Sequence, residues 1–198
     1  PYTTLFRSYF KACQLLIDFV LLILFLPFYV VVLLITSIIV LIFDGRPVFF
    51  VQERVGLNLK CFKIYKFRTM SLNINLTESE RISKVGNFLR RSSLDELPQL
   101  INILKRDMSF VGPRPLTREV LISKSSSPSA YKRSSVLPGL TGYTQAKYTG
   151  SRRSFAQKLK IDLEYVDKKT CLLLFKILFM TIKVLFVRFK HNKTGETL

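Results

Sequence analysis

The sequence has no tryptophan and a single histidine, His191, which lies in the polar C-terminal tail. This position excludes mechanisms that need a histidine base in the folded body, such as a Ser-His-Asp triad. The chain also lacks a Gly-x-Gly-x-x-Gly stretch and a P-loop, so a nucleotide would have to be held in another way. Its three cysteines, Cys13, Cys61 and Cys171, form neither a metal-binding spacing nor a disulfide framework, and we expect reduced thiols.

Acidic residues are scarce: 13 stand against 31 lysines and arginines, for a net charge of +18, while 48% of residues are hydrophobic. The length of 198 residues allows one compact domain. A chain that is both basic and apolar suggests either a nucleic-acid binder or a protein seated on anionic lipid. The cations lack the interleaved aromatic residues of a stacking platform, so we do not expect a nucleic-acid partner.

A long apolar segment dominates the N-terminal part. Residues 1–8 are expected to be a non-native leader, because they read like one frame of a common sequencing adaptor. Phe19 to Phe43 then carries no charge over 25 residues, which exceeds the roughly 20 that a spanning helix needs. We therefore predict a membrane helix within residues 9–45, followed by one integrated cytosolic domain over residues 46–198.

The mode of insertion depends on Pro27, where a helix loses a backbone hydrogen bond and kinks. A sharp bend there would return the segment to the same face of the membrane, whereas a continuous helix would cross it. Lys11 precedes the segment, and Arg46, Arg54 and Lys60 follow it, so positive charge on both flanks favours a re-entrant helix with both ends in the cytoplasm.

A second apolar segment, Cys171 to Phe189, carries Lys176, Lys183 and Lys190 at intervals of seven. This spacing keeps the lysines near one helical face and favours a helix lying in the membrane interface. The alternative is an ordinary amphipathic core helix. Between the two apolar segments we predict strands at 48–51 and 62–67, a loop at 71–82, and helices from about Ser93 and over 152–168. The predicted fold class is α+β, mainly helical, in a monotopic membrane protein.

The chemistry is expected at Asp95 and Glu96, which follow Arg90 and Arg91 at a predicted helix start. One interpretation is structural, because Ser93-x-x-Glu96 matches a capping box. The other is that Asp95 is a nucleophile toward phosphorus, since carboxylates form acyl phosphates, and that Glu96 holds a magnesium ion on a diphosphate. Three further cations near turns or element ends, Lys66, Arg68 and Arg114, support phosphate chemistry.

Five stretches, taken together, resemble the bacterial sugar transferases, the small monotopic phosphoglycosyl transferases. They are GRPVFFVQERVG at 45–56, FKIYKFRTM at 62–70, SLDELPQL at 93–100, MSFVGPRP at 108–115, and PGLTG at 138–142 with Gln145. The resemblance implies a re-entrant helix broken at Pro27 and a catalytic dyad of Asp95 and Glu96. It also implies substrate-binding roles for Lys66, Arg90, Arg114, and the adjoining Arg68, Pro113 and Gln145.

For function, the resemblance implies that the aspartate attacks a UDP-sugar, expels UMP and forms a phosphosugar-enzyme, from which polyprenyl phosphate takes the phosphosugar. Magnesium is the implied cofactor, and the bacterial inner membrane, with the site on its cytoplasmic face, the implied location. The implied partners are a UDP-sugar, polyprenyl phosphate and the bilayer, and the chain could also form a homodimer. A catalytically degenerate membrane-surface paralogue is the alternative.

Two departures from the family pattern bear on activity. Gln14 and Leu15 stand where a Lys-Arg pair usually precedes the first helix's aspartate, here Asp18. Residues 173–178 read LLFKIL instead of LDLKIL, so Leu174 replaces an aspartate.

Overall fold

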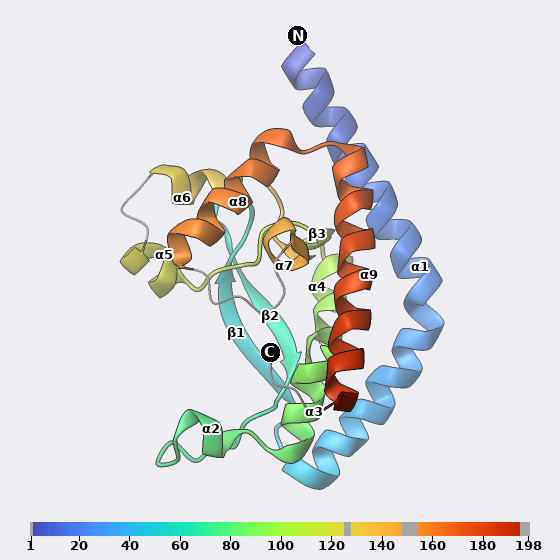
Figure 1. Ribbon diagram of the computed structural model, residues 1–198, viewed down its shortest axis with the longest axis vertical. Helices are drawn as coiled ribbons and strands as arrows, with labels where there is room; N and C mark the ends of the chain where they lie inside the picture. Colours follow the sequence, from blue (N-terminus) through green and yellow to red (C-terminus); the bar gives the residue numbers. More distant parts are fainter. Residues whose placement is uncertain (1, 125–127, 148–153, 195–198) are drawn as a thin grey trace.

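The computed structural model describes residues 2–124, 128–147 and 154–194. It is mainly helical with short strands, and a long N-terminal helix runs along one side of the molecule (Figure 1). The elements are α1 (Tyr2–Asp44), β1 (Phe49–Val55), η1 (Leu57–Leu59), β2 (Cys61–Phe67), α2 (Glu78–Arg81), α3 (Lys84–Ser92), η2 (Leu94–Gln99), α4 (Leu100–Leu104), β3 (Ser109–Val111), α5 (Arg118–Lys124), α6 (Pro128–Lys132), η3 (Arg133–Ser135), β4 (Gly139–Thr141), α7 (Tyr143–Lys147), α8 (Phe155–Lys168) and α9 (Cys171–Thr194).

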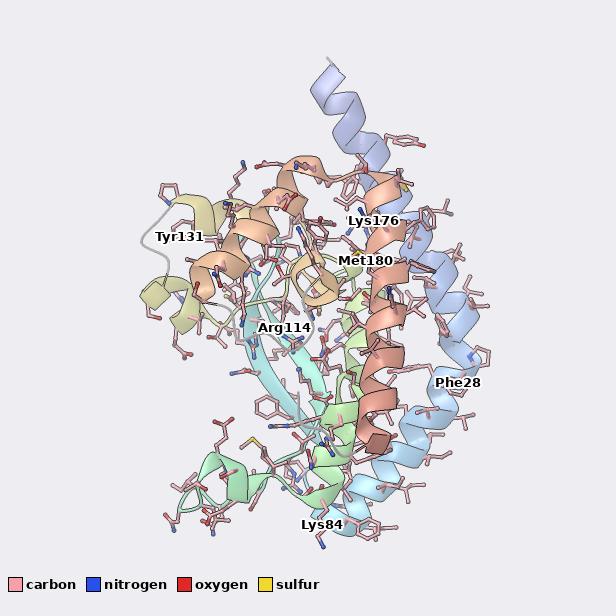
Figure 2. The ribbon with its side chains drawn as sticks, viewed as in Figure 1. Phe28, Lys84, Arg114, Tyr131, Lys176 and Met180 are labelled. Atoms are coloured by element: carbon pink, nitrogen blue, oxygen red, sulfur yellow. A yellow bond between two sulfur atoms is a disulfide. The ribbon has the colours of Figure 1, made fainter. Side chains whose placement is uncertain are left out.

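Helix α1 stays helical through Pro27 and changes direction near Phe28, which Figure 2 labels on the outer side of the bend. Proline has no N–H to donate, and its ring crowds the preceding turn, which accounts for the bend. Within the described residues, Ser8–Asp44 is the one segment long and apolar enough to enter a membrane. The predicted apolar helix is therefore confirmed, but the structure bends it at Pro27 instead of breaking it there.

One face of α1 packs on the body of the protein. Ile17, Tyr29 and Val40 belong to three separate core clusters along its length. The opposite face carries exposed apolar side chains, including Ile23 and Leu34. A contiguous exposed apolar face of this length is typical of contact with lipid.

Helix α9 lies beside α1 (Figure 1) and buries Leu174 and Ile177 in the same cluster as Ile17. Its other side exposes Leu172 and Phe179. Cys13 of α1 and Cys171 of α9 are paired as a disulfide, with their Cα atoms 6.1 Å apart. The expectation of reduced thiols was therefore wrong for this pair, because residues 158 apart in sequence become neighbours only when the two helices pack.

The remaining strands form two small sheets. β1 and β2, the two strands that the sequence predicted, pair in antiparallel register, with Phe49 opposite Phe67. β3 and β4 pair in parallel, which the sequence did not predict. The two strands approach so closely that a Cβ on Gly139 would overlap the backbone nitrogen of Gly112, which explains why both motifs need glycine there.

Two predicted helices differ in detail from the structure. The segment from Ser93 forms the 3-10 helix η2 before the short α4, instead of one continuous α-helix. Pro98 lies inside η2, where it would disrupt an α-helix that began at Ser93. Residues 71–82, predicted as a loop, contain the one-turn helix α2.

Candidate active site

Asp95 and Glu96 lie in the first turn of η2, just after a left-handed residue. Ser93 has φ of 59° and ends α3, and its side chain makes no capping bond to η2. The capping box that the sequence suggested is therefore not formed. Ser93 instead ends α3 in the left-handed conformation, and the two carboxylates belong to a new element, η2, that packs on β2.

Two cations converge on Glu96. Lys66 Nζ of β2 lies 2.7 Å from Glu96 Oε1, and Arg114 Nη2, which follows β3, lies 2.6 Å from the same oxygen. The Lys66 and Glu96 side chains are largely buried, whereas Arg114 is half exposed. Charge-assisted bonds in a half-buried site hold both partners in place more strongly than surface ion pairs do. The structure thus joins three of the predicted site residues directly.

The pKa values of the two carboxyl groups of the dyad are shifted in opposite directions. Burial, with the adjacent charge of Glu96, raises the pKa of Asp95 above the ordinary aspartate value, although Lys66, Arg114 and Arg90 partly offset this effect. Burial also raises the pKa of Glu96, but Arg114 and Lys66 together outweigh it and hold that pKa below the usual value. Adjacent carboxyls with separated pKa values are typical of sites in which each group has its own role.

A cavity of about 1020 Å³ opens in front of the dyad. Its polar part is strongly cationic, because the described residues place six basic side chains along it and only two carboxylates, Asp95 and Glu96. The six are Arg54, Lys66, Arg68, Arg81, Arg90 and Arg114. Excess positive charge in a partly buried space favours a polyanion such as a diphosphate.

The rest of the cavity is apolar and reaches the two long helices. Leu21, Phe28 and Tyr29 of α1 line it, as do Leu178 and Ile182 of α9. The Tyr29 hydroxyl is buried and has no hydrogen-bond partner among the described residues. The cavity therefore joins a cationic half to an apolar half.

Arg68 lines the cavity, yet its guanidinium is committed to the backbone. It donates to the carbonyls of Asp44, Gly45 and Pro47, with 2.7 Å from Nε to Pro47 O and 2.9 Å from Nη2 to Gly45 O. These bonds hold the C-terminal end of α1 to β2. Substrate binding by Arg68 stays a prediction, and the contacts that the structure describes are structural.

The other predicted residues also lie at or beside the cavity. Arg90 donates to Thr69 Oγ1 at 2.8 Å, and its charge acts on Asp95. Pro113 is buried behind Arg114. The Gln145 side chain donates weakly to Leu140 O at 3.4 Å, while its Oε1 is buried without a partner among the described residues. An unused buried acceptor on a cavity wall is suited to a ligand hydroxyl.

Two sets of lining residues were not predicted as part of the site. Arg54 was interpreted only as a cation flanking the apolar segment, although its place in the 45–56 motif was an available signal. Burial lowers the pKa of the Arg54 guanidinium, and so does the nearby positive charge of Arg114. The apolar wall from α1 and α9 had no local signal, because it depends on the packing of distant segments.

Metal binding would depend on the dyad and the substrate together. The described residues contain no cluster of three or more His, Cys, Asp or Glu side chains that could hold a metal alone. Mg²⁺ is commonly held by one or two carboxylates plus substrate phosphates. Both cations contact the same oxygen of Glu96, Oε1, so Oε2 can serve a metal ion. The donor set therefore fits magnesium bound with a diphosphate.

Comparison with known proteins places these residues in context. The family described as bacterial sugar transferase matches residues 9–188. A sugar transferase of Bacillus subtilis strain 168, EpsL, is 40% identical over 162 residues, which cover 79% of each chain. The UDP-glucose:undecaprenyl-phosphate glucose-1-phosphate transferase of Escherichia coli K12 is 38% identical over 69% of this chain. The undecaprenyl-phosphate galactose phosphotransferase of Salmonella typhimurium LT2 is 35% identical over 73%. The match covers only 32% and 34% of the last two relatives.

Proposed function

Because the chain belongs to the bacterial sugar transferase family, we propose that it transfers a sugar-1-phosphate from a UDP-sugar to undecaprenyl phosphate, as the first step of polysaccharide assembly. The observation that carries this proposal is the carboxylate dyad in a cavity with a cationic half and an apolar half. A nucleotide-sugar diphosphate suits the first half, and an isoprenoid chain suits the second.

In the first step, a carboxylate oxygen of Asp95 attacks the phosphorus that bears the sugar. The bond from that phosphorus to the bridging oxygen of UMP breaks, and UMP leaves with the electron pair. The product is an acyl phosphate in which Asp95 carries the phosphosugar. Arg114 and Lys66 are placed to stabilise the charge on the transferring group, which is the main demand of phosphoryl transfer.

In the second step, a phosphate oxygen of undecaprenyl phosphate attacks the same phosphorus. The acyl phosphate bond breaks, the Asp95 carboxylate is regenerated, and the sugar is linked to the lipid through a diphosphate. Burial helps here, because a desolvated carboxylate is more reactive and a sheltered acyl phosphate is protected from hydrolysis.

Glu96 and Asp95 are the residues that would hold magnesium with the substrate diphosphate. When bound, the metal neutralises phosphate charge and favours departure of UMP. Lys66 and Arg114 orient the Glu96 carboxylate for this role through their bonds to Oε1. Gln145 Oε1 is placed to accept a hydroxyl of the donor on the cavity wall.

The proposed location is the inner membrane, with the active site at its cytoplasmic face. The exposed apolar faces of α1 and α9 would contact lipid, and the bend at Pro27 would let α1 enter and return as a re-entrant helix. The apolar half of the cavity, between these helices, would receive the acceptor's hydrocarbon chain from the bilayer.

Neither departure from the family pattern lies in the dyad or in the described cavity lining, so neither favours the degenerate alternative. Leu174 replaces a family aspartate, but it is buried in the cluster around Ile17 and does not belong to the described cavity lining. Gln14 replaces a family lysine and donates to Ser109 Oγ and Val111 O, both at 2.9 Å, so it still joins α1 to β3. Neither change touches the dyad.

The deciding experiment measures UMP release from a panel of UDP-sugars by membrane fractions supplied with magnesium and undecaprenyl phosphate. Asp95→Asn should abolish release, and the wild type should form an acid-stable radiolabelled adduct with a donor labelled in the sugar-bearing phosphate. Asp167→Asn, which alters an exposed ion pair with Lys132, is the matched control and should behave as the wild type. UMP release that survives in Asp95→Asn would refute the nucleophile assignment.

A further inference from the structure

The segment that carries Arg114, the strap of residues 113–116, is held through its backbone carbonyls. Each of its four consecutive carbonyl oxygens accepts a hydrogen bond from a different residue. The bonds are Gly139 N to Pro113 O at 3.0 Å, Arg133 Nη2 to Arg114 O at 2.9 Å, Arg54 Nη1 to Pro115 O at 3.3 Å, and Val55 N to Leu116 O at 2.8 Å.

The sequence of the strap explains this arrangement. Pro113 and Pro115 have no backbone N–H, so the strap cannot pair as an ordinary strand on both sides. Its position must come from donors that approach its carbonyls. Two of these donors are arginine side chains. Unlike a backbone amide, an arginine side chain can position the strap only if other contacts hold the side chain itself in place.

Arg133 is held by a buried ion pair. Its Nη2 lies 2.5 Å from Asp162 Oδ2, and the two side chains are each only 8% exposed. Thr144 Oγ1 donates to the other oxygen of Asp162 at 2.6 Å. Buried charges are tolerated only when they are paired and hydrogen-bonded, and this pair satisfies both conditions. Asp162, Arg133, Arg114 and Glu96 thus form one continuous chain of contacts.

We propose that Arg133, fixed by Asp162, is a positioning residue that aims the Arg114 guanidinium at Glu96 and the transferring phosphate. Only the expected effect on kcat rests on the proposed function; the positioning of Arg114 does not. Arg114 is half exposed, so its own packing does not fix it, and the buried pair supplies the rigidity through the strap backbone. Neither Arg133 nor Asp162 is among the described residues lining the cavity.

The structure provides a matched control in the neighbouring ion pair. Lys132 Nζ lies 2.6 Å from Asp167 Oδ1, and this pair links the same region, α6 with its following turn, to the same helix α8. Both its side chains are more than half exposed, and none of the four described hydrogen bonds to the strap carbonyls comes from either of them. Asp167→Asn therefore removes an α6–α8 ion pair without removing a strap contact.

The test combines kinetics with hydrogen exchange on the full chain in membranes or nanodiscs. Asp162→Asn should lower kcat by about 10- to 100-fold with little change in KM for the UDP-sugar, because small misplacement of a transition-state group costs rate. Thr144→Val, a milder change, should act in the same direction. In an Arg114→Ala background, Asp162→Asn should add less than about twofold, since its effect passes through Arg114.

Amide exchange separates this inference from the proposed function. Peptides that include Val55 and Gly139, whose amides donate to the strap carbonyls, should exchange faster in Asp162→Asn but not in Asp167→Asn, whether or not a donor sugar has been found. Unchanged exchange in Asp162→Asn, or an equal loss of kcat with and without Arg114, would overturn the positioning role. Absence of wild-type activity with every donor would count against the proposed function alone.

Discussion

Arg114 donates to Oε1 of Glu96 at 2.6 Å from a backbone position flanked by two prolines. Lys66 reaches the same oxygen from a strand 48 residues earlier in the chain, at 2.7 Å. Two positive charges on one oxygen hold Glu96 ionised, while its neighbour Asp95 is desolvated and has a raised pKa.

Asp95→Asn should abolish transfer and raise the melting temperature at neutral pH by a few degrees. Folding raises the pKa of Asp95. Ionised Asp95 therefore lowers the free energy of unfolding at pH values above the raised pKa, and it has no effect at pH values below the ordinary pKa of 3.8. Thermal unfolding as a function of pH checks this, and the gain over the wild type should shrink on acidification. A variant less stable than the wild type at neutral pH would contradict it.

Lys66→Met and Glu96→Gln should shift the acid limb of the pH profile of kcat/KM in opposite directions. Lys66 lowers the pKa of Asp95, so its loss should move the limb to higher pH, while loss of the Glu96 charge should move it lower. Both variants should also be slower than the wild type. The measurement is the pH profile of kcat/KM for each variant at saturating magnesium. If the acid limbs of both variants shift in the same direction, Asp95 is excluded as the titrating group.

Ile182→Asn should raise KM for undecaprenyl phosphate while leaving KM for the UDP-sugar within about twofold. Ile182 lines the apolar half of the cavity on α9, and a polar side chain there disfavours a hydrocarbon chain. Leu172→Asn, also on α9, is the control, because Leu172 is 79% exposed and is not among the described lining residues. Equal effects of the two substitutions would indicate general weakening of membrane contact.

Arg68→Met should destabilise the fold by about 3 kcal/mol and leave KM for the UDP-sugar unchanged in the folded fraction. The loss leaves the carbonyls of Asp44, Gly45 and Pro47 without their shared donor. Arg46→Met, at an exposed arginine nearby, is the control for charge removal. A raised KM with normal stability would instead support the substrate-binding role expected from the sequence.

Protein isolated without reductant should show one thiol, Cys61, to a maleimide under denaturing conditions, and three after reduction. Cys171→Ser should then expose Cys13 to the reagent and lower stability by about 2–4 kcal/mol, since the bond closes a very long loop. Cys61→Ser should leave stability unchanged. Labelling of three thiols before reduction would show that Cys13 and Cys171 are not joined.

Local sequence patterns were sufficient for much of the fold. Alternation identified the β1–β2 hairpin, and an uncharged run identified α1, because both signals depend on neighbours in sequence. The β3–β4 pair was missed since it has only three residues a strand and joins segments 30 residues apart. The Cys13–Cys171 pair and the apolar cavity wall depend on α1 meeting α9, which no local pattern reports.

The candidate site was predictable to a similar extent. Asp95, Glu96, Lys66 and Arg114 were chosen from carboxylates and cations near element ends, and the structure brings them together. The capping box at Ser93 was the wrong alternative, because the αL turn at that residue depends on how α3 meets η2. Arg54 and Arg133 escaped notice because their role lies in carbonyl contacts to a proline-rich segment, visible only in three dimensions.

The cavity is walled by α1 and α9, whose nearest ends, Asp44 and Cys171, lie 127 residues apart in the sequence. The apolar half of the cavity therefore exists only when these two helices are packed together, and a movement of one helix away from the other would open that half along its length. The shape of the apolar half consequently depends on the packing of two distant segments and not on any single lining residue.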